Sequence, residues 1–209
     1  FSFLYLSIIL SKMSKMIVIS DFMPVPVYAL RKHIHFQLVH DLRNFNIYKD
    51  SLLRIKWRIQ KLQWQQCQQI LTVSNFSKKE LIKYCKINPK KIFVSPNGIE
   101  KAYFGTKYSI KDEFDLLYIA NFEKRKNHSL LLRALSKINI QISVCFVGSD
   151  SAQKSKIQTL SHSLSGVDFT FMESNLNEEK LIELYDKSKI YVCPSLYEGF
   201  CMPLLEAMS

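Results

Sequence analysis

Residues 116–147 read LLYIANFEKRKNHSLLLRALSKINIQISVCFV, and this stretch decides the fold. The apolar runs at 116–120 and 142–147 are predicted to be strands. Residues 127–136, between them, are predicted to form a helix. A strand, a helix and a strand at this spacing predict a β-α-β unit, in which the two strands lie parallel.

The same alternation continues to the end of the chain. It predicts helices at 151–163 and 177–188, strands at 167–171 and 190–193, and a helix that opens near Met202. This regular succession indicates an α/β fold with a parallel sheet. The sequence contains no internal repeat and no glycine-rich nucleotide loop of the Gly-x-Gly-x-x-Gly or Walker type.

The preceding half of the chain follows a similar plan. Apolar runs predict strands at 17–20, 34–39, 70–74 and 91–94. A long amphipathic helix is expected at 51–69, with Trp57 and Trp64 as core anchors. Its apolar stripe is assigned to residues at helical spacing: Leu52, Ile55, Ile59, Leu62 and Gln66.

Two local patterns predict where elements begin and turn. Residues 77–80 have the Ser-x-x-Glu form of a capping box, so a helix is expected to start near Lys78. Pro96-Asn97-Gly98 is predicted to be a sharp turn, because glycine accepts a positive φ angle at little cost.

Charge divides the chain into two parts. Residues 1–110 contain 18 Lys and Arg against five Asp and Glu, whereas residues 111–209 contain 11 against 13. This asymmetry predicts two modules, with a boundary in the polar stretch 100–113 that we place between an N-terminal domain, 1–108, and a C-terminal domain, 109–209. The basic part is expected either to meet an anionic partner or to be only a solvated surface.

The remaining compositional features indicate a folded cytoplasmic protein. Apolar residues make up 47% and charged residues 22% of the chain, which is typical of globular domains. The apolar run 1–10 is interpreted as a core helix, with a remnant of a membrane or signal segment as the alternative. Five widely spaced cysteines are expected to be reduced, buried thiols with no metal-ligand spacing: Cys67, Cys85, Cys145, Cys193 and Cys201.

Polar motifs follow several predicted strands, at the sheet edge where α/β proteins bind ligands. Residues 121–127, NFEKRKN, combine Arg and Lys with a helix start, which suits a diphosphate, although such a loop can also be simply solvated. Residues 197–206, YEGFCMPLLE, place two glutamates that can accept hydrogen bonds from hydroxyl groups, or that can merely face solvent. His40-Asp41 follows the predicted strand at 34–39.

Taken in order, these segments resemble the group 1, or family 4, glycosyltransferases. The resemblance rests on residues 73–81 (VSNFSKKEL), 94–99 (VSPNGI), 118–127 (YIANFEKRKN), 198–200 (EGF) and 206–208 (EAM). His40-Asp41-Leu42 resembles a strand end of the mannosyltransferase-like members. The resemblance implies a GT-B fold, in which two Rossmann-like domains with parallel sheets face each other across a cleft. It also implies a hexosyltransferase that uses a nucleoside diphosphate sugar, with GDP-mannose favoured, retains the anomeric configuration and needs no metal or other cofactor.

Roles carry over to the positions that match the family pattern. Arg125 and Lys126 are expected to neutralise the donor diphosphate. Glu206 is expected to hold the ribose, and Glu198 the donor sugar. The residues assigned to catalysis are His40, which would reach across the cleft, Glu198 and Lys126. The hinge between the domains is assigned to Asn97 and Gly98. The donor-binding set is Asn121, Arg125, Lys126, Glu198, Gly199, Phe200 and Glu206.

Some residues depart from the family pattern, and other functions stay open. Ala120 stands where the family usually has Gly, Asn121 where some members carry a further basic ligand, and Cys201 where Gly is common. Both ends of the family's domains are expected to lie outside this chain. We expect a glycan or lipid-linked acceptor and a peripheral membrane contact through the basic half. The alternatives are an inactive fragment of such an enzyme, or a basic protein that binds membranes or nucleic acid, for which no nucleic-acid module is recognised.

Overall fold

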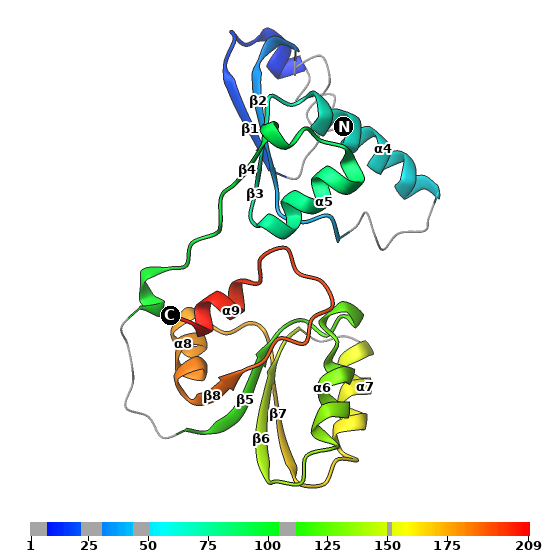
Figure 1. Ribbon diagram of the computed structural model, residues 1–209. Coiled ribbons are helices and arrows are strands. Elements are labelled where there is room, and N and C mark those ends of the chain that lie inside the picture. Colours follow the sequence, from blue (N-terminus) through cyan, green and yellow to red (C-terminus); the bar gives the residue numbers. More distant parts are fainter. Residues whose placement is uncertain (1–7, 22–30, 44–50, 105–111, 150–151) are drawn as a thin grey trace. The chain divides into compact units, whose positions relative to one another are not determined.

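The computed structural model describes residues 8–21, 31–43, 51–104, 112–149 and 152–209 of the 209-residue chain. The chain forms two compact units, each with its own parallel sheet (Figure 1). Unit 1 comprises Phe1–Asn97 together with Glu198–Phe200, and unit 2 comprises Gly98–Tyr197 together with Cys201–Ser209. The expected boundary between residues 108 and 109 lies outside the described residues.

Unit 1 contains a four-stranded sheet in the order β1-β2-β3-β4, with every neighbouring pair parallel. Its elements, in chain order, are β1 (Ile17–Asp21), β2 (Ile34–Val39), α4 (Ser51–Gln66), β3 (Gln69–Thr72), α5 (Asn75–Cys85), the 3-10 helix η1 (Pro89–Lys91) and β4 (Ile92–Val94). The core of unit 1 joins α4 and α5 to one face of the sheet, through residues such as Trp64, Leu81 and Ile70. The expected strands are confirmed, and so is Trp64 as a core residue.

The apolar stripe expected on α4 is wrong in its orientation. Ile55, Ile59 and Leu62 are each more than half exposed, whereas Gln60 and Gln63 on another side of the helix are buried. Trp57 packs partly against the core, and its ring centroid lies 6.4 Å from that of Trp64. The tryptophans, rather than the aliphatic residues, therefore select the face that packs on the sheet.

Two further local predictions for unit 1 are also wrong. Helix α5 begins at Asn75 rather than near Lys78, because the Ser74 side chain caps it by accepting a hydrogen bond from the Ser77 amide. Residues 96–98 form no turn, and Gly98 does not have a positive φ angle. A side chain at Gly98 would meet only open space, so no local feature requires glycine there.

Unit 2 contains the second sheet, in the order β7-β6-β5-β8, again with all neighbours parallel. Its elements are the 3-10 helix η2 (Lys101–Tyr103), β5 (Phe114–Ile119), the 3-10 helix η3 (Lys124–Lys126), α6 (His128–Leu135), β6 (Ile142–Val147), α7 (Ala152–Ser161), β7 (Val167–Met172), α8 (Glu178–Asp186), β8 (Ser188–Tyr191) and α9 (Met202–Ala207). Every strand and helix expected here is present, with ends shifted by up to two residues. The short 3-10 helices η2 and η3 were not expected.

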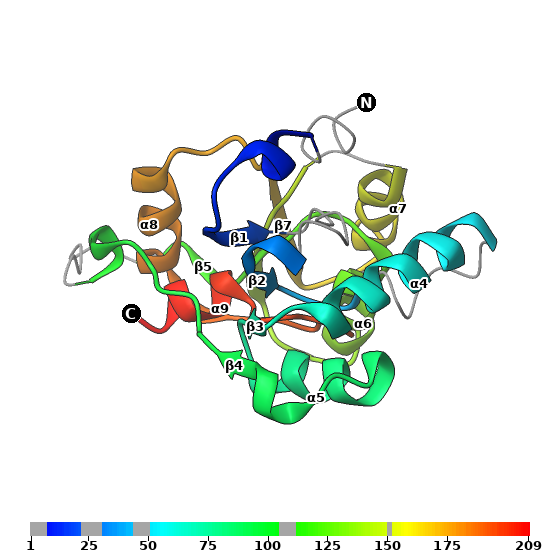
Figure 2. The same ribbon diagram turned by 90° about the horizontal axis from the view of Figure 1, so that it is seen from above.

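Helices cover both faces of the unit 2 sheet. Helices α6 and α7 lie on one face and α8 lies on the other (Figures 1 and 2). Leu131, Leu132 and Leu135 of α6 pack with Ile157 of α7 in one core cluster, and Leu184 of α8 packs in the other. Strands buried on both faces read as continuous apolar runs, as β6 does. Unit 2 is therefore a doubly wound α/β unit, as expected from the sequence.

The apolar run at the start of the chain falls mostly outside the described residues. Within its described part Leu10 is buried, and Ile8 and Ile9 are exposed. Among the helices that the structure describes, none has the length and hydropathy that a membrane span requires.

Candidate functional site

The order of strands in unit 2 creates a switch point beside β5. The chain adds β6 and β7 on one side of β5 and then returns to place β8 on the other side. In doubly wound sheets, ligands bind outside the carboxyl ends of the strands at this type of position. The segments that leave β5 and β8 are residues 120–127 and 192–201, which hold most of the candidate residues.

Hydrogen bonds join the segment after β5 to the segment after β8. Tyr118 is buried, with 1% of its surface exposed. Its hydroxyl donates a 2.7 Å hydrogen bond to the Lys126 carbonyl and lies 3.1 Å from the Ser195 hydroxyl. The Asn127 side-chain amide donates to the Pro194 carbonyl over 3.2 Å. The backbone that carries Lys126 is therefore fixed by Tyr118 and by Pro194 and Ser195, which are about seventy positions away in the sequence.

Arg125 makes the second part of this network. Its carbonyl accepts a 2.8 Å hydrogen bond from the Leu196 amide, and its guanidinium donates to the Tyr197 carbonyl over 3.3 Å. The guanidinium also pairs with Glu123 at 2.8 Å. Arg125 thus holds the two segments together as well as supplying positive charge.

The cationic segment leads directly into a helix. Lys124, Arg125 and Lys126 form η3, Asn127 then adopts a left-handed conformation with φ of 57°, and α6 begins at His128. Asn is one of the few residues that tolerates this conformation. Basic side chains beside the positive end of a helix make a site suited to an anion.

Asn121 ties the end of β5 to the end of β6. Its side-chain oxygen accepts hydrogen bonds from the Ser149 hydroxyl at 2.9 Å and from the Ser149 amide at 3.3 Å. Close packing is also visible at Gly148, where a Cβ atom would lie 2.3 Å from the Ala120 carbonyl oxygen. Only glycine therefore fits at the end of β6 without displacing the segment after β5.

Glu206 lies on α9 and is held by a tyrosine of α8. The Tyr185 hydroxyl donates to its carboxylate over 2.7 Å. Tyr185 packs against Tyr103 and Tyr191, with ring centroids 6.1 Å and 5.8 Å away. Burial, and then the nearby Glu206 charge, raise the pKa of Tyr103 to about 12 and that of Tyr185 well beyond its usual range. Both hydroxyls therefore stay protonated, and Tyr185 stays a donor, throughout the physiological pH range.

His40 lies in unit 1, directly after β2. Its Nε2 atom is 3.3 Å from an Asp21 carboxylate oxygen, and both side chains are substantially exposed. The Ser77 hydroxyl donates to the His40 carbonyl over 3.1 Å, which fixes the backbone at the end of the strand. Unit 1 also includes Glu198–Phe200, and a Cβ atom on Gly199 would lie 2.5 Å from the same carbonyl oxygen. Glycine at position 199 is thus required by close backbone packing.

The remaining candidates are placed as follows. Asn97 and Gly98 lie where unit 1 ends and unit 2 begins. Glu198, Gly199 and Phe200 are all half-buried. The structure therefore brings Arg125 and Lys126 together with residues 194–197, and it ties Asn121 to Ser149 instead. Glu206 lies on α9 and contacts α8 through Tyr185.

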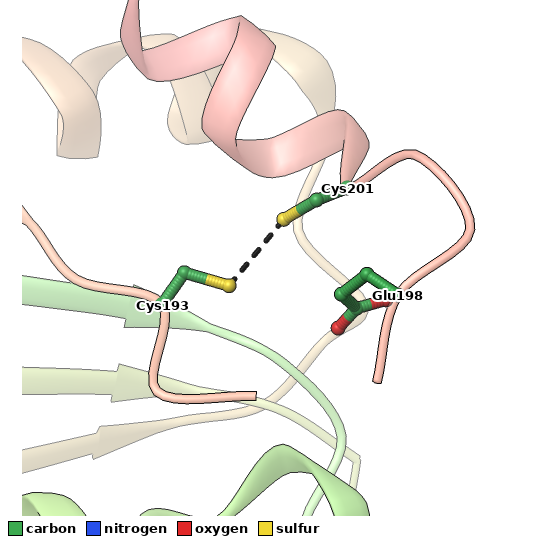
Figure 3. A group of neighbouring side chains, drawn as sticks. All are labelled: Cys193, Glu198 and Cys201. Atoms are coloured by element: carbon green, nitrogen blue, oxygen red, sulfur yellow. Dashed lines mark hydrogen bonds between the residues drawn. The ribbon is translucent and has the colours of Figure 1, made fainter. Parts of the chain in front are cut away.

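The cysteines fall into two classes. Cys67, Cys85 and Cys145 are buried, as expected, and desolvation raises the pKa of each thiol to about 12. Cys193 and Cys201 are only half-buried, so the expectation of buried thiols is wrong for them. Their sulfur atoms lie 3.5 Å apart, on the segment that also carries Glu198 (Figure 3).

One surface hollow of unit 2 lies away from these segments. It has a volume of about 390 Å³ and is lined by residues of α7 and β7, such as His162 and Phe169. The candidate residues do not line this hollow, because they follow the carboxyl ends of β5 and β8. We therefore place the candidate site in the hydrogen-bonded segments after these two strands.

Three residues that sequence reasoning did not select help to build the site. Tyr118 and Ser195 fix the backbone at Lys126, and Tyr185 holds Glu206. A tyrosine in the middle of an apolar strand is a recognisable signal, because its hydroxyl needs a buried partner. The partners themselves could not be read from the sequence.

Comparison with protein families matches both parts of the chain. Residues 100–209 match the family model described as glycosyl transferases group 1, and residues 17–103 match the one described as glycosyltransferase family 4. The first match covers more than half of the chain. Each family model falls almost entirely within one of the two compact units.

Individual relatives agree with these matches. The chain is 27% identical to the serotype-specific mannosyltransferase WbdA of Escherichia coli over 70% of the chain and 20% of that protein. It is 30% identical to the O-antigen chain mannosyltransferase RfbU of Salmonella typhimurium over 82% of the chain and 48% of that protein. The chain therefore spans half or less of the length of these curated relatives.

A solved structure shows the same fold. Anabaena Alr3699/HepE, crystallised in complex with UDP, matches 97% of the chain and 60% of its own length, with a TM-score of 0.73 and 13% sequence identity. The two parallel sheets and this similarity confirm the α/β fold class of the GT-B type.

Proposed function

Because the chain belongs to the group 1 glycosyl transferases, we propose that it transfers a sugar from a nucleoside diphosphate sugar to a glycan or lipid-linked acceptor. The observation that carries this proposal is the hydrogen-bonded junction at the β5–β8 switch point of unit 2. It holds a cationic segment at the place where α/β sheets receive a nucleotide. A diphosphate is the ligand that this charge and these helix amides suit best.

The proposed transfer proceeds with retention of configuration and without a metal ion. Lys126 stabilises the charge that develops on the departing diphosphate, and Arg125 adds positive charge while holding the segment in place. The incoming hydroxyl attacks from the face that the diphosphate leaves, and a diphosphate oxygen accepts its proton. No protein carboxylate needs to act as the nucleophile in this scheme.

The remaining candidates bind the donor and the acceptor. Glu206 accepts hydrogen bonds from the ribose hydroxyls, in an orientation set by Tyr185. Glu198 and the amides of Gly199 and Phe200 bind the donor sugar. His40, which lies on the unit 1 backbone next to Gly199, contacts the sugar or the acceptor.

GDP-mannose is the donor that we favour. The names of WbdA and RfbU, both mannosyltransferases, favour a mannose donor, whereas the HepE structure contains UDP. The first experiment should therefore identify the nucleotide that the chain binds. Thermal unfolding of the 209-residue chain should be measured with GDP, UDP and ADP sugars in the presence of a chelator. Ligand at a hundredfold excess over its Kd should stabilise the chain by about 2.7 kcal/mol.

Matched variants test the assignments. Glu206→Ala should abolish the stabilisation by the donor, whereas Glu179→Ala, an exposed carboxylate on α8, should keep it. Lys126→Ala should lower kcat by about a hundredfold or more, whereas Lys124→Ala, an exposed cation of the same segment, should have little effect. No stabilisation by any nucleotide sugar, or equal effects of the paired variants, would contradict the proposal. Loss of activity in the chelator would refute the metal-free mechanism.

We also propose that unit 1 makes a peripheral contact with an anionic membrane. Helix α4 exposes Ile55, Ile59 and Leu62, and the exposed Arg58 lies on the same helix. Apolar and basic residues on one exposed helix are typical of helices that lie in a membrane surface. The excess of Lys and Arg in residues 1–110 favours anionic lipids.

Vesicle sedimentation tests this contact. The chain should bind vesicles that contain phosphatidylglycerol and should not bind vesicles of phosphatidylcholine alone. Burial of one isoleucine contributes about 2 kcal/mol, so Ile59→Asp should weaken binding at least tenfold. Ile140→Asp, at an exposed isoleucine of unit 2, should leave it unchanged. Equal weakening by both variants, or binding that follows only the salt concentration, would contradict the role of α4.

A further inference from the structure

Cys193 and Cys201 are the two cysteines of the chain that are only half-buried. The other three cysteines are buried, with pKa values raised to about 12, so they carry almost no thiolate at neutral pH. Cysteine reacts through its thiolate, and oxidation is selective for accessible thiols. Any oxidation of the folded chain should therefore fall first on Cys193 and Cys201.

The two thiols are placed to react with each other. Their sulfur atoms are 3.5 Å apart, on either side of a seven-residue segment, 194–200 (Figure 3). A disulfide bond is about 2.05 Å long, so the sulfur atoms must approach by about 1.5 Å. Cys193 follows β8 in an irregular segment, and Cys201 precedes α9 with a φ angle of 70°. Neither residue lies inside a helix or strand that would resist this movement.

We propose that Cys193 and Cys201 form an oxidation site that closes to an intramolecular disulfide and thereby slows sugar transfer. Hydrogen peroxide is the oxidant. One thiolate attacks a peroxide oxygen, the O–O bond breaks, and a sulfenic acid and water form. The second thiolate then attacks the sulfenic sulfur, the S–O bond breaks, and a second water leaves. In total the two thiols give up two protons and two electrons, and one hydrogen peroxide takes them up to become two waters.

The effect on transfer rests on the proposed function. The segment closed by the disulfide includes Leu196 and Tyr197, whose backbone groups hydrogen-bond to Arg125. It also includes Glu198–Phe200, to which we assign the donor sugar. A displacement of about 1 Å in a positioning group can lower turnover about a hundredfold. We therefore expect the disulfide to slow transfer by at least tenfold, reversibly.

The test uses the reduced 209-residue chain, freed of reductant and kept in a chelator so that no metal ion protects the thiols. After treatment with hydrogen peroxide the chain is alkylated and digested with trypsin. Residues 190–209 form one tryptic peptide that contains both cysteines and no internal Lys or Arg. We expect this peptide to lose two hydrogen atoms and to resist alkylation, and dithiothreitol should restore both thiols. Cys193→Ser and Cys201→Ser should each prevent the loss.

Sugar transfer and donor binding are measured on the same samples. For each variant, the transfer rate after oxidation is divided by the transfer rate before oxidation. This ratio should be 0.1 or lower, on the order of a tenfold loss, for the unaltered chain and should stay near one for both serine variants. The proposed disulfide would be refuted if both thiols could still be alkylated after a treatment that oxidises free cysteine. It would also be refuted if one sulfur were oxidised to a sulfinic acid and no disulfide formed. A disulfide with an unchanged ratio would overturn its effect on transfer. A disulfide in a chain that neither binds nor transfers any sugar when reduced would refute the proposed function and support the oxidation site.

Discussion

Acidification should destabilise unit 2 through one buried histidine, His128, the first residue of α6. Its ring stacks on Phe122 with centroids 4.6 Å apart, and it lies 4.7 Å from Tyr118 and 5.3 Å from Phe146. Within the described residues its Nε2 atom has no hydrogen-bond partner. Burial, and then the charge of Lys126, lower its pKa from 6.5 to about 4.

The magnitude follows from the two pKa values. Above pH 6.5 the histidine is neutral in both the folded and the unfolded chain, so its contribution to the free energy of unfolding is complete. Below that pH the unfolded chain binds the proton first, and stability falls until the pH reaches about 4. Each pKa unit corresponds to about 1.4 kcal/mol, so the loss should be about 1.4 kcal/mol at pH 5.5 and about 3 kcal/mol at pH 4. Carboxylates also titrate over this range, but they do so equally in a variant that lacks only the histidine.

The measurement compares the chain with His128→Phe in urea at pH 7, 5.5 and 4. Pulsed hydrogen exchange on peptides that cover β5 and β6 follows the unfolding of unit 2. Fluorescence follows unit 1 separately, because Trp57 and Trp64 are the two tryptophans of the chain and both lie in α4. His128→Phe should reduce the loss in unit 2 between pH 7 and pH 4 by about 3 kcal/mol and leave the fluorescence transition unchanged. An equal loss in both proteins would refute the assignment to His128.

Three further substitutions have defined outcomes. Tyr185→Phe removes the hydrogen bond to the Glu206 carboxylate, and a bond to a charged group is worth about 1.5–3 kcal/mol, so calorimetry should show donor affinity at least tenfold lower. Unchanged affinity would separate Tyr185 from the donor site. Gly148→Ala places a Cβ atom 2.3 Å from the Ala120 carbonyl oxygen and should destabilise unit 2 by about 3 kcal/mol in urea; a loss below about 1 kcal/mol would show that the strand ends yield easily. Ser74→Ala removes the cap of α5 and should lower the free energy of unfolding of unit 1 by about 1 kcal/mol, measured by tryptophan fluorescence. An unchanged free energy of unfolding would show that another residue caps the helix.

The succession of strands and helices could be predicted because it depends on local patterns. Each strand is a short apolar run between polar breaks, and the parallel arrangement follows from the intervening helices. The face that α4 buries could not be predicted in the same way, because apolar residues occur on more than one side of it. Ile55 and Ile59 compete with Trp64, and the larger aromatic ring packs against the sheet.

The start of α5 shows a related ambiguity. Ser74 and Ser77 are both suitable capping residues, and Glu80 completes the pattern for the second. In the folded chain the Ser77 hydroxyl is buried and donates to the His40 carbonyl. A contact with a segment 37 residues away therefore assigns the cap to Ser74, and no local rule contains that contact.

The sequence could locate the candidate site because its motifs directly follow predicted strands. It could not predict the contacts that hold these motifs in place. Its internal support depends on which strands are neighbours, and the order β7-β6-β5-β8 is a property of the whole sheet. That order places the segment after β5 between two others. Asn121 bonds to Ser149 on the β6 side, while Asn127 bonds to Pro194 on the β8 side. The position of Lys126 is thus determined from both directions by residues that are remote in the sequence, and a motif match at Lys126 alone does not ensure a competent site.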